Sequence, residues 1–374
     1  MSADTNYALD SSDVLREIPA PNLTYQPQFP ECGKHKIGLI GCGGITTQHL
    51  TAYRNAGLEV VALCNRTLEK AEARRAEFYP NARVYTDPIE LLANKEVTVV
   101  DLTLHPGPRA AWIEAALRAG KHVLSQKPFV LDLNKGQELV RLAEQQKRLL
   151  AVNQNGRWAP YVRYAQLAID RGLIGEVQSL TVNVCWNHGW VEGTPFDRIH
   201  HLLLYDFAMH WVDMACCFMS RPARIAHAML AKSPGQKVAP PLIGSAQLSF
   251  DAGLATLHFD GCTKLSAFES IQIIGTRGRI SATGKSLEAH HLELITEDGI
   301  ARPNLGGHWM PDGFGGTMGE LLCAINENRQ PYHSAANNLR SLEAVFALIA
   351  SADEGRTVRV GEARSVGANC QIQP

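Results

Sequence analysis

A glycine-rich turn directly after a short apolar run is the feature that most restricts how this chain can fold. Residues 36–40 read KIGLI, and residues 41–45 read GCGGI before a helix-like stretch begins. In this setting glycines permit a tight turn and let the backbone approach a pyrophosphate, and the N–H groups of the next helix face the anion. The pattern therefore predicts a strand, a dinucleotide-binding loop and a helix. A glycine-rich turn without a ligand is the alternative.

Apolar, β-rich runs continue to alternate with helix-like segments beyond this turn. The runs EVVALC, VTVVDLTL and KHVLS are separated by amphipathic stretches, which predicts a doubly wound parallel sheet. Near residue 153 the rhythm changes to longer runs of period two, such as VQSLTVNVCW, which favour an antiparallel sheet. We therefore expect an α/β chain in three parts: an extended arm over 1–34, lying on or off the fold, a doubly wound nucleotide-binding domain over 35–152, and a second, α+β domain over 153–374, whose C-terminal helix is free to pack back on the first domain.

Composition removes several classes of function. The 374 residues include 36 Lys and Arg against 37 Asp and Glu, and no long run of one sign indicates nucleic-acid binding. No uninterrupted apolar stretch approaches the roughly 18 residues of a membrane span, and the first residues lack the pattern of a signal peptide. The 9 cysteines have irregular spacings that fit reduced thiols better than a disulfide framework or a zinc cage. We expect a cytoplasmic protein without nucleic-acid or membrane partners.

Two positions around the glycine loop depart from the usual dinucleotide pattern. Thr46 stands where a third glycine or an alanine is common, which predicts slightly looser packing of helix on strand. Asn65 and Arg66 follow the second strand, where a carboxylate normally accepts the ribose hydroxyls. An amide can still accept a hydroxyl hydrogen bond, and the missing negative charge beside an arginine would tolerate a 2′-phosphate. NAD and NADP both stay open, and a solvated arginine is the alternative for Arg66.

A lysine follows the run KHVLS at the edge where open α/β sheets bind their ligands. The residues there are Gln126, Lys127 and Pro128. An ammonium at this edge can hydrogen-bond a substrate oxygen and stabilise negative charge as a hydroxyl loses its proton. A solvated loop lysine is the alternative.

Polar residues recur at helical spacing inside the apolar segment 201–219. Asp206, His210 and Asp213 stand at i, i+4 and i+7, so on one α-helix they form a single polar stripe. An imidazole held by a neighbouring carboxylate is a common general base near neutral pH. The alternatives are a structural, ion-paired core histidine and a metal site that joins His200 or His201 to the stripe. Because no spacing is as specific as HExxH, we expect no metal.

Taken together, these motifs resemble the Gfo/Idh/MocA oxidoreductases, the superfamily of glucose-fructose oxidoreductase and inositol dehydrogenase. The resemblance lies in GCGGI, in Lys127-Pro128, in Arg157-Trp158-x-Pro160 and in DFAMHWVD at 206–213, and it spans nearly the whole chain after residue 35. It implies a Rossmann domain, a C-terminal α+β domain with a large open, mostly antiparallel sheet, a substrate cleft between them, and a homodimer or homotetramer built through that sheet.

The resemblance also implies roles for individual residues. It places Lys127, Asp206 and His210 in the catalytic positions. The residues expected to contact the cofactor are Gly41, Gly43, Gly44, Ile45, Asn65, Arg66, His105, Gln126, Lys127 and Asn155. Those expected to contact the substrate are Arg157, Trp186, His188, Arg198 and His201, since the segment 185–201 mixes aromatic and polar side chains suited to a sugar. A surface loop with incidental aromatics is the alternative for that segment.

The expected function is an NAD(P)-dependent oxidoreductase acting on a sugar, polyol or glycoside hydroxyl. His210 is the expected base, Lys127 polarises the same oxygen, and Asp206 binds the substrate or orients the imidazole. Asp213 is expected to be structural. One alternative is an NAD-dependent glycoside hydrolase that oxidises, eliminates, adds water and reduces again. The other is a non-catalytic nucleotide- or sugar-binding module, because a fold alone does not give a function.

Overall fold

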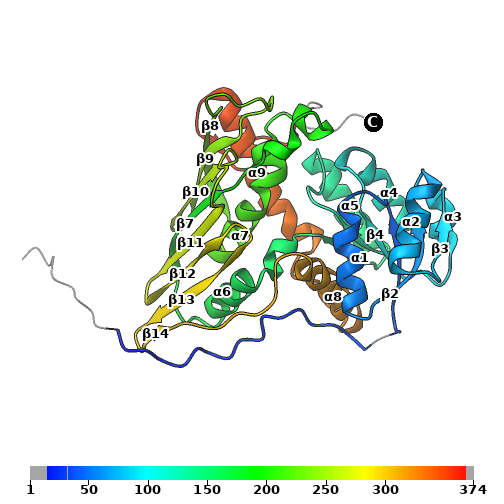
Figure 1. The fold of residues 1–374 in the computed structure, drawn as a ribbon, viewed down its shortest axis with the longest axis horizontal. Helices are drawn as coiled ribbons and strands as arrows, with labels where there is room; N and C mark the ends of the chain where they lie inside the picture. The colour runs from blue at the N-terminus through cyan, green and yellow to red at the C-terminus, as the bar shows by residue number, and fades with distance from the viewer. Residues whose placement is uncertain (1–14, 32, 368–374) are drawn as a thin grey trace, which may run out of the picture.

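The structure is a computed structural model that describes residues 15–31 and 33–367. It contains two sheets with helices between and around them (Figure 1). The first is six-stranded, in the order β3-β2-β1-β4-β5-β6, and every neighbouring pair is parallel. Its strands are β1 (Lys36–Ile40), β2 (Glu59–Cys64), β3 (Arg83–Tyr85), β4 (Val99–Leu102), β5 (His122–Ser125) and β6 (Leu150–Val152). Its helices are α1 (Thr46–Asn55), α2 (Leu68–Phe78), α3 (Pro88–Ala93), α4 (Pro106–Arg118) and α5 (Leu133–Gln145).

Local chemistry sets the ends of these helices. The Asp87 side chain accepts a hydrogen bond from the Ile89 N–H at 2.8 Å and so starts α3. The Asp132 carboxylate accepts from two N–H groups at the start of α5. Gly120, at φ +74°, takes the left-handed conformation just after α4. The parallel sheet expected from the alternating pattern is confirmed.

The second sheet has nine strands in the order β14-β13-β12-β11-β7-β10-β9-β8-β15. Its strands are β7 (Val177–Cys185), β8 (Ala223–Ala231), β9 (Ile243–Phe250), β10 (Leu254–Asp260), β11 (Phe268–Gly275), β12 (Gly278–Lys285), β13 (Glu288–Thr296), β14 (Gly299–Ala301) and β15 (Val358–Arg359). All pairs are antiparallel except β7 with β10. Burial alternates along these strands, as the period of two predicts. The mostly antiparallel sheet is therefore confirmed.

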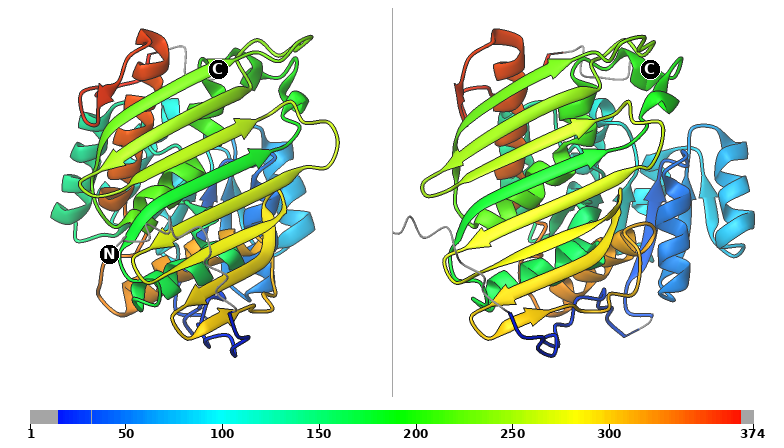
Figure 2. Two further views of the ribbon diagram at one scale, coloured as in Figure 1. Left: turned by 90° about the vertical axis from the view of Figure 1, so that its left-hand side faces the viewer. Right: turned by 60° about the vertical axis from the view of Figure 1, so that its left-hand side comes forward.

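Helices cover one face of the nine-stranded sheet and leave the other bare (Figure 2). The covering helices are α6 (Pro160–Asp170), α7 (Met209–Met219) and α9 (Ala335–Glu354), which lie between this sheet and the six-stranded half (Figure 1). Inward side chains of β8, such as Ala226 and Ala228, are buried, whereas Ile225 and Met229 on the bare face are exposed. Within the described ranges, no helix is both long and apolar enough to cross a membrane.

Helix α8 (Asp312–Asn326) comes late in the chain but belongs to the core of the six-stranded half. Its apolar side chains Phe314, Met318 and Leu321 are buried in one cluster with Leu50 and Tyr53 of α1. Figure 1 shows α8 beside α1. The hydrophobic core on this side of the parallel sheet is therefore completed by residues more than 150 positions beyond β6.

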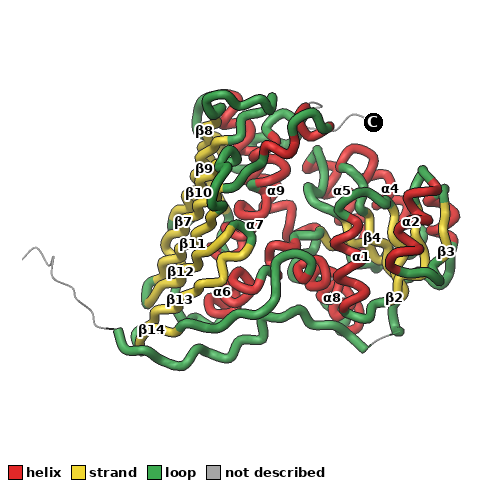
Figure 3. Tube along the Cα trace, in the orientation of Figure 1, coloured by secondary structure: helices red, strands yellow, loops and turns green. Residues whose placement is uncertain are grey.

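The described part of the N-terminal arm, residues 15–31, lies on the fold and crosses from one half to the other. It follows an extended path along one end of the molecule, drawn as loop in Figure 3. Ile18 donates its N–H to the Ile300 carbonyl at 2.9 Å beside the nine-stranded sheet. The Pro21 carbonyl accepts from the Tyr164 hydroxyl of α6, and Phe29 packs against Gly319 of α8. Residues 1–14 lie outside the described ranges.

Candidate active site

The glycine loop contains one glycine that the fold requires and two that it does not. Gly41 has φ +105°, and a Cβ there would lie 2.8 Å from the Thr103 hydroxyl oxygen, so a side chain is excluded by conformation and by space. At Gly43 and Gly44 a Cβ would meet nothing within 4 Å. Both residues are exposed beside the start of α1. The loop thus leaves open the volume in which a pyrophosphate would meet backbone N–H groups.

Thr46 occupies a position where a smaller residue is common, which led us to predict slightly looser packing of α1 on the sheet. It is fully buried, and its hydroxyl donates to the Gly41 carbonyl at 2.9 Å. The Thr103 hydroxyl also donates to that carbonyl. The Thr46 hydroxyl therefore contributes a hydrogen bond that holds the turn at Gly41.

Asn65 is part of the glycine loop's support. Its Oδ1 accepts from the Cys42 N–H at 3.0 Å, and its Nδ2 donates to the Thr67 carbonyl at 3.0 Å. The side chain thereby ties the end of β2 to the loop, a role that the sequence pattern did not indicate. Arg66 is exposed and makes no ion pair with another described residue. It is therefore available to a negatively charged ligand.

Lys127 and Asp206 meet across the two halves of the molecule. Lys127 follows β5, and its peptide bond to Pro128 is cis. Its Nζ donates to the Asp206 backbone carbonyl at 2.7 Å and to Asp206 Oδ1 at 3.1 Å. The lysine side chain is only 15% exposed, so it is not the solvated loop lysine of the alternative interpretation.

Asp206, His210 and Asp213 do not form one polar stripe, contrary to the expectation. Asp206 lies in the π-helical segment η4 (Leu203–Phe207), in which the Ala208 N–H donates to the Leu203 carbonyl at 2.7 Å. This i→i+5 turn shifts the phase of the helix before α7 begins. Asp206 consequently faces Lys127, whereas Asp213 accepts two hydrogen bonds from Arg157 at 2.6 and 2.7 Å.

His210 lies in the core near Lys127, and no carboxylate of the described residues bonds its ring. The ring packs edge-on against Trp309, with centroids 5.4 Å apart, and Nδ1 is buried without a hydrogen-bond partner among the described residues. Burial, together with the positive charge of Lys127, holds the pKa of His210 well below its usual value of 6.5. The imidazole is therefore neutral near pH 7 and presents a lone pair. The expected contact between the His210 imidazole and a carboxylate is not found among the described residues, because Asp206 bonds Lys127 instead.

A buried polar network lies behind Lys127. His49 of α1 is fully buried, and its Nδ1 lies 2.7 Å from Asp101 Oδ2. Its Nε2 lies 3.3 Å from the Gln126 amide nitrogen and 3.2 Å from that of Asn153. Gln126 Oε1 accepts the Lys127 N–H at 2.7 Å, so the network fixes the backbone that carries the lysine. No sequence spacing indicated this network, because its members come from separate strand ends and helices.

An aromatic cluster stands beside the Lys127–Asp206 pair. His188 is buried, with its ring 4.4 Å from that of Phe207 and 5.3 Å from those of Trp186 and Trp190. Burial lowers the pKa of His188 to about 4; the negative charge of Asp206 opposes this shift, and the positive charge of Lys127 adds to it.

Two further predicted residues lie around this cluster. The ring of His105 lies 6.2 Å from that of Phe196. Burial and Arg109 lower the pKa of His105, while Asp206 opposes them. Arg198 is exposed and has no ion pair to a described residue. The structure thus brings His105 and His188 into the electrostatic range of Asp206.

Three of the expected site residues are bound to other parts of the protein. Arg157, an expected substrate contact, donates to Asp213, the Tyr332 carbonyl and Asn337. Asn155 accepts the Trp309 indole N–H at 2.7 Å and so holds the ring that packs on His210. His201, another expected substrate contact, bonds Asp353 of α9 at 2.7 Å. Arg157 was expected from its place in a family motif and His201 from the mix of aromatic and polar residues around it, and neither signal reveals such partners.

Comparison with known proteins places this site in a family. Residues 35–154 match a family model described as an oxidoreductase family with an NAD-binding Rossmann fold. Residues 162–281 match the GFO/IDH/MocA C-terminal domain. The chain belongs to the Gfo/Idh/MocA oxidoreductase family. The resemblance drawn from the sequence is thereby confirmed.

Relatives extend over nearly the full chain of this Gfo/Idh/MocA protein. D-apiose dehydrogenase of Paraburkholderia graminis is 26% identical over 366 residues, covering 94% of this chain and 95% of that protein. Inositol 2-dehydrogenase of Rhizobium meliloti is 24% identical, covering 87% of this chain and 99% of that protein. The crystal structure of an oxidoreductase from Agrobacterium radiobacter in complex with NAD+, L-tartaric acid and magnesium has a TM-score of 0.80 at 21% identity and covers 88% of this chain and 99% of that chain. This likeness confirms the fold.

Proposed function

We propose that this Gfo/Idh/MocA oxidoreductase transfers a hydride between NAD(P) and a hydroxyl carbon of a sugar, polyol or glycoside. The observation that carries the proposal is the 3.1 Å contact between Lys127 Nζ and Asp206 Oδ1, beside a buried His210. An ammonium, a carboxylate and a neutral imidazole from two halves of the chain supply what alcohol oxidation needs besides a hydride acceptor. The names of the apiose and inositol dehydrogenases support a polyhydroxylated substrate.

The residues of the glycine loop fit a dinucleotide. Open space at Gly43 and Gly44 admits a pyrophosphate, with Gly41 shaping the turn and Ile45 leading into α1. When bound, the nicotinamide supplies the hydride acceptor or donor. Asn65 supports the loop, and the exposed Arg66 is the cation we propose for a 2′-phosphate, so NADP is accepted as well as NAD. His105, Gln126 and Lys127 follow β4 and β5 at the sheet edge where such ligands bind.

The proton of the substrate hydroxyl goes to His210 in this proposal. In this proposal a neutral imidazole with a lowered pKa would accept the proton while the carbon gives its hydride to the oxidised nicotinamide, so the products would be a carbonyl compound, an imidazolium and reduced cofactor. The Lys127 ammonium stabilises negative charge on the same oxygen. Asp206 holds the lysine in place through the 3.1 Å ion pair, rather than orienting the imidazole as the sequence suggested.

The aromatic cluster is the proposed substrate surface. Trp186 and His188 pack together beside Phe207, and Trp190 is 56% exposed at the edge of the cluster. Flat aromatic faces suit the apolar C–H faces of a sugar ring, and polar side chains suit its hydroxyls. Arg198, which has no ion pair to a described residue, is the proposed hydroxyl or anion contact at this edge.

A sugar panel followed by the absorbance of reduced nicotinamide tests the proposal. We expect at least one sugar, polyol or glycoside to reduce NAD or NADP with the parent protein and roughly 10²-fold more slowly with Lys127→Ala. Cleavage of a glycoside without net change of reduced cofactor would replace this function by redox-cycling hydrolysis. Cofactor binding without turnover of any kind would favour a non-catalytic module.

We also propose that the chain forms a homodimer or homotetramer through the bare face of the nine-stranded sheet. Ile225 and Met229 project from β8 on this face, and Leu254 is also largely exposed. Exposed apolar side chains on one uncovered sheet face are typical of an association surface. Light scattering should give a dimer or tetramer for the parent and a smaller species for Met229→Lys. A monomeric parent would contradict the proposal.

A further inference from the structure

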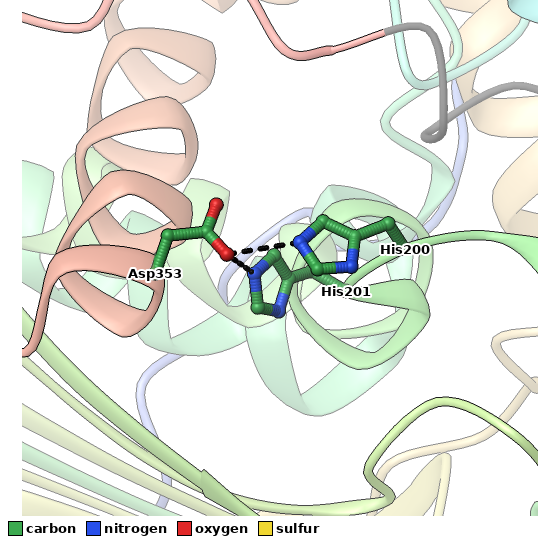
Figure 4. Close-up of side chains that lie close together, drawn as sticks. All are labelled: His200, His201 and Asp353. Atoms are coloured by element: carbon green, nitrogen blue, oxygen red, sulfur yellow. Dashed lines mark hydrogen bonds and ion pairs between the residues drawn. The ribbon is translucent and has the colours of Figure 1, made fainter.

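A cluster of metal-ligand side chains lies apart from the Lys127–Asp206 pair. His200 and His201 stand just before η4, and Asp353 is in the last turn of α9. Figure 4 shows both imidazoles directed at the same carboxylate. His200 Nε2 lies 2.9 Å and His201 Nε2 lies 2.7 Å from Asp353 Oδ1. One donor atom from each residue can be chosen so that all three lie within 4.8 Å of one another.

The backbone at His201 brings these consecutive side chains together. His201 has φ +52°, in the left-handed region that non-glycine residues adopt uncommonly. The two rings have centroids 3.8 Å apart, although side chains of consecutive residues usually diverge. His201 is buried and its Nδ1 has no hydrogen-bond partner among the described residues, so the contact with Asp353 is the polar interaction that accounts for its placement.

The donor set suits a borderline-soft divalent ion. Two imidazole nitrogens and one carboxylate oxygen are the ligands found in zinc sites that keep a fourth position for water. Zinc–nitrogen distances of about 2.0–2.1 Å in tetrahedral geometry require donors about 3.3 Å apart. Donors now 2.7 and 2.9 Å apart would separate by about half an ångström. The side chains of His200 and Asp353 are 50% and 46% exposed, so there is space on the solvent side for this adjustment.

We propose that His200, His201 and Asp353 bind one divalent transition-metal ion of the Zn²⁺ class. Each neutral imidazole gives the ion its Nε2 lone pair and carries its proton on Nδ1, and the carboxylate gives one oxygen. The site differs from the one that the sequence left open, because these histidines face Asp353 and not the residues at 206, 210 and 213.

Position in the fold gives the ion a structural consequence for the active site. The His201 carbonyl accepts the Tyr205 N–H at 2.9 Å, so His201 begins the turn that presents Asp206. A metal ion would therefore tie the end of α9 to the segment that positions Asp206 against Lys127. Its proposed ligands do not include Lys127, Asp206 or His210, and its binding is measurable without any turnover.

Calorimetric titration of Zn²⁺ into the tag-free, chelator-treated full chain tests the proposal. We expect one ion per chain for the parent. His200→Ala and Asp353→Asn should each weaken binding by at least the roughly 10–100-fold that loss of an outer-shell partner costs. His308→Ala is the matched control, because His308 is 62% exposed and lies 3.5 Å from Glu288 in a simple ion pair. This control should bind zinc like the parent.

Cobalt supplies a second readout of the ligands. Co²⁺ bound by two imidazoles and a carboxylate should give visible d–d absorption in the parent and in His308→Ala that is lost in His200→Ala. Since His200 is largely exposed, that variant should melt like the parent without metal. Saturable binding that is equal in parent, His200→Ala and Asp353→Asn would overturn the proposal, as would the lack of saturable binding of Zn²⁺ and Co²⁺ by the parent.

Discussion

Replacement of Asp213 by asparagine should separate structural support from catalysis in this chain. Asp213 of α7 is 1% exposed and accepts from Arg157 Nε at 2.6 Å, from Arg157 Nη2 at 2.7 Å and from the Ser341 hydroxyl at 2.6 Å. Arg157 is itself buried and donates further to the Tyr332 carbonyl at 2.7 Å. An asparagine keeps one acceptor oxygen and turns an NH₂ group toward the guanidinium.

The expected loss follows from leaving a buried cation without its counter-charge. Removing one partner of a buried ion pair typically costs about 3–5 kcal/mol. With an unfolding entropy of about 2.1 cal/mol/K per residue, a chain of this size would melt about 4–6 °C lower. The hydrophobic double variant Arg157→Met with Asp213→Leu should recover much of that loss, because no buried charge is then left unpaired.

Differential scanning calorimetry measures the melting temperature, and the pH dependence of kcat/KM measures the chemistry. Because Asp213 faces Arg157 and not Lys127, Asp213→Asn should leave the pH profile where it is in the parent. A melting temperature within about 1 °C of the parent value, instead of the expected decrease of about 4–6 °C, would refute the stability argument. A displaced pH profile would show that Asp213 belongs to the proton-transfer machinery.

Four other substitutions address the cofactor loop, the proposed base His210 and the buried His188. His210→Ala should lower kcat roughly 10²-fold with almost unchanged cofactor affinity. In the parent, the decrease of kcat/KM on the acid side should lie well below pH 6.5. Near-parental turnover of the variant would show that His210 is not the base. Gly43→Val should abolish cofactor binding in a fluorescence titration without lowering the melting temperature. Gly41→Ala should lower the melting temperature, because Gly41, unlike Gly43, has a positive φ and a close neighbour. His188 stays neutral in the folded state, with a pKa of about 4, and charges near pH 6.5 when unfolded, so acid favours unfolding. Between pH 7 and pH 5 the protonation of His188 in the unfolded state should lower the free energy of unfolding of the parent by about 2 kcal/mol, a loss that His188→Phe should not show. Urea unfolding at both pH values measures this difference, and an equal loss in both proteins would contradict the prediction.

Local sequence patterns were sufficient to predict most of the fold. The position of GCGGI after an apolar run was enough to predict the first strand, loop and helix, because each is determined by neighbours in sequence. The strands β3 and β6 were not predicted, because a strand of three residues is too short to show a hydrophobic period. The parallel pairing of β7 with β10 and the packing of α8 on α1 depend on contacts that no local pattern encodes.

The candidate site shows the same division between near and distant information. Motif positions led to Lys127, Asp206 and His210, and the structure places Lys127 against Asp206 with its charge acting on His210. Helical spacing failed at Asp213 because a π-turn intervenes. The partner of His201 lies 152 residues away in sequence, and that of Arg157 lies 56 away. Burial and partner geometry at such separations arise only from the assembled core.

The late position of α8 has a consequence during synthesis on the ribosome. Strand β6 ends at Val152, but Phe314 and Met318, which cover Leu50 and Tyr53 of α1, are made about 160 residues later. At a translation rate of about 5–20 residues per second, α8 is synthesised roughly 8–30 seconds after β6, and until then the apolar face of α1 is not packed against it. During that interval the nascent chain exposes a surface that chaperones bind and that promotes aggregation, so slowed translation between these segments should lower the yield of folded protein.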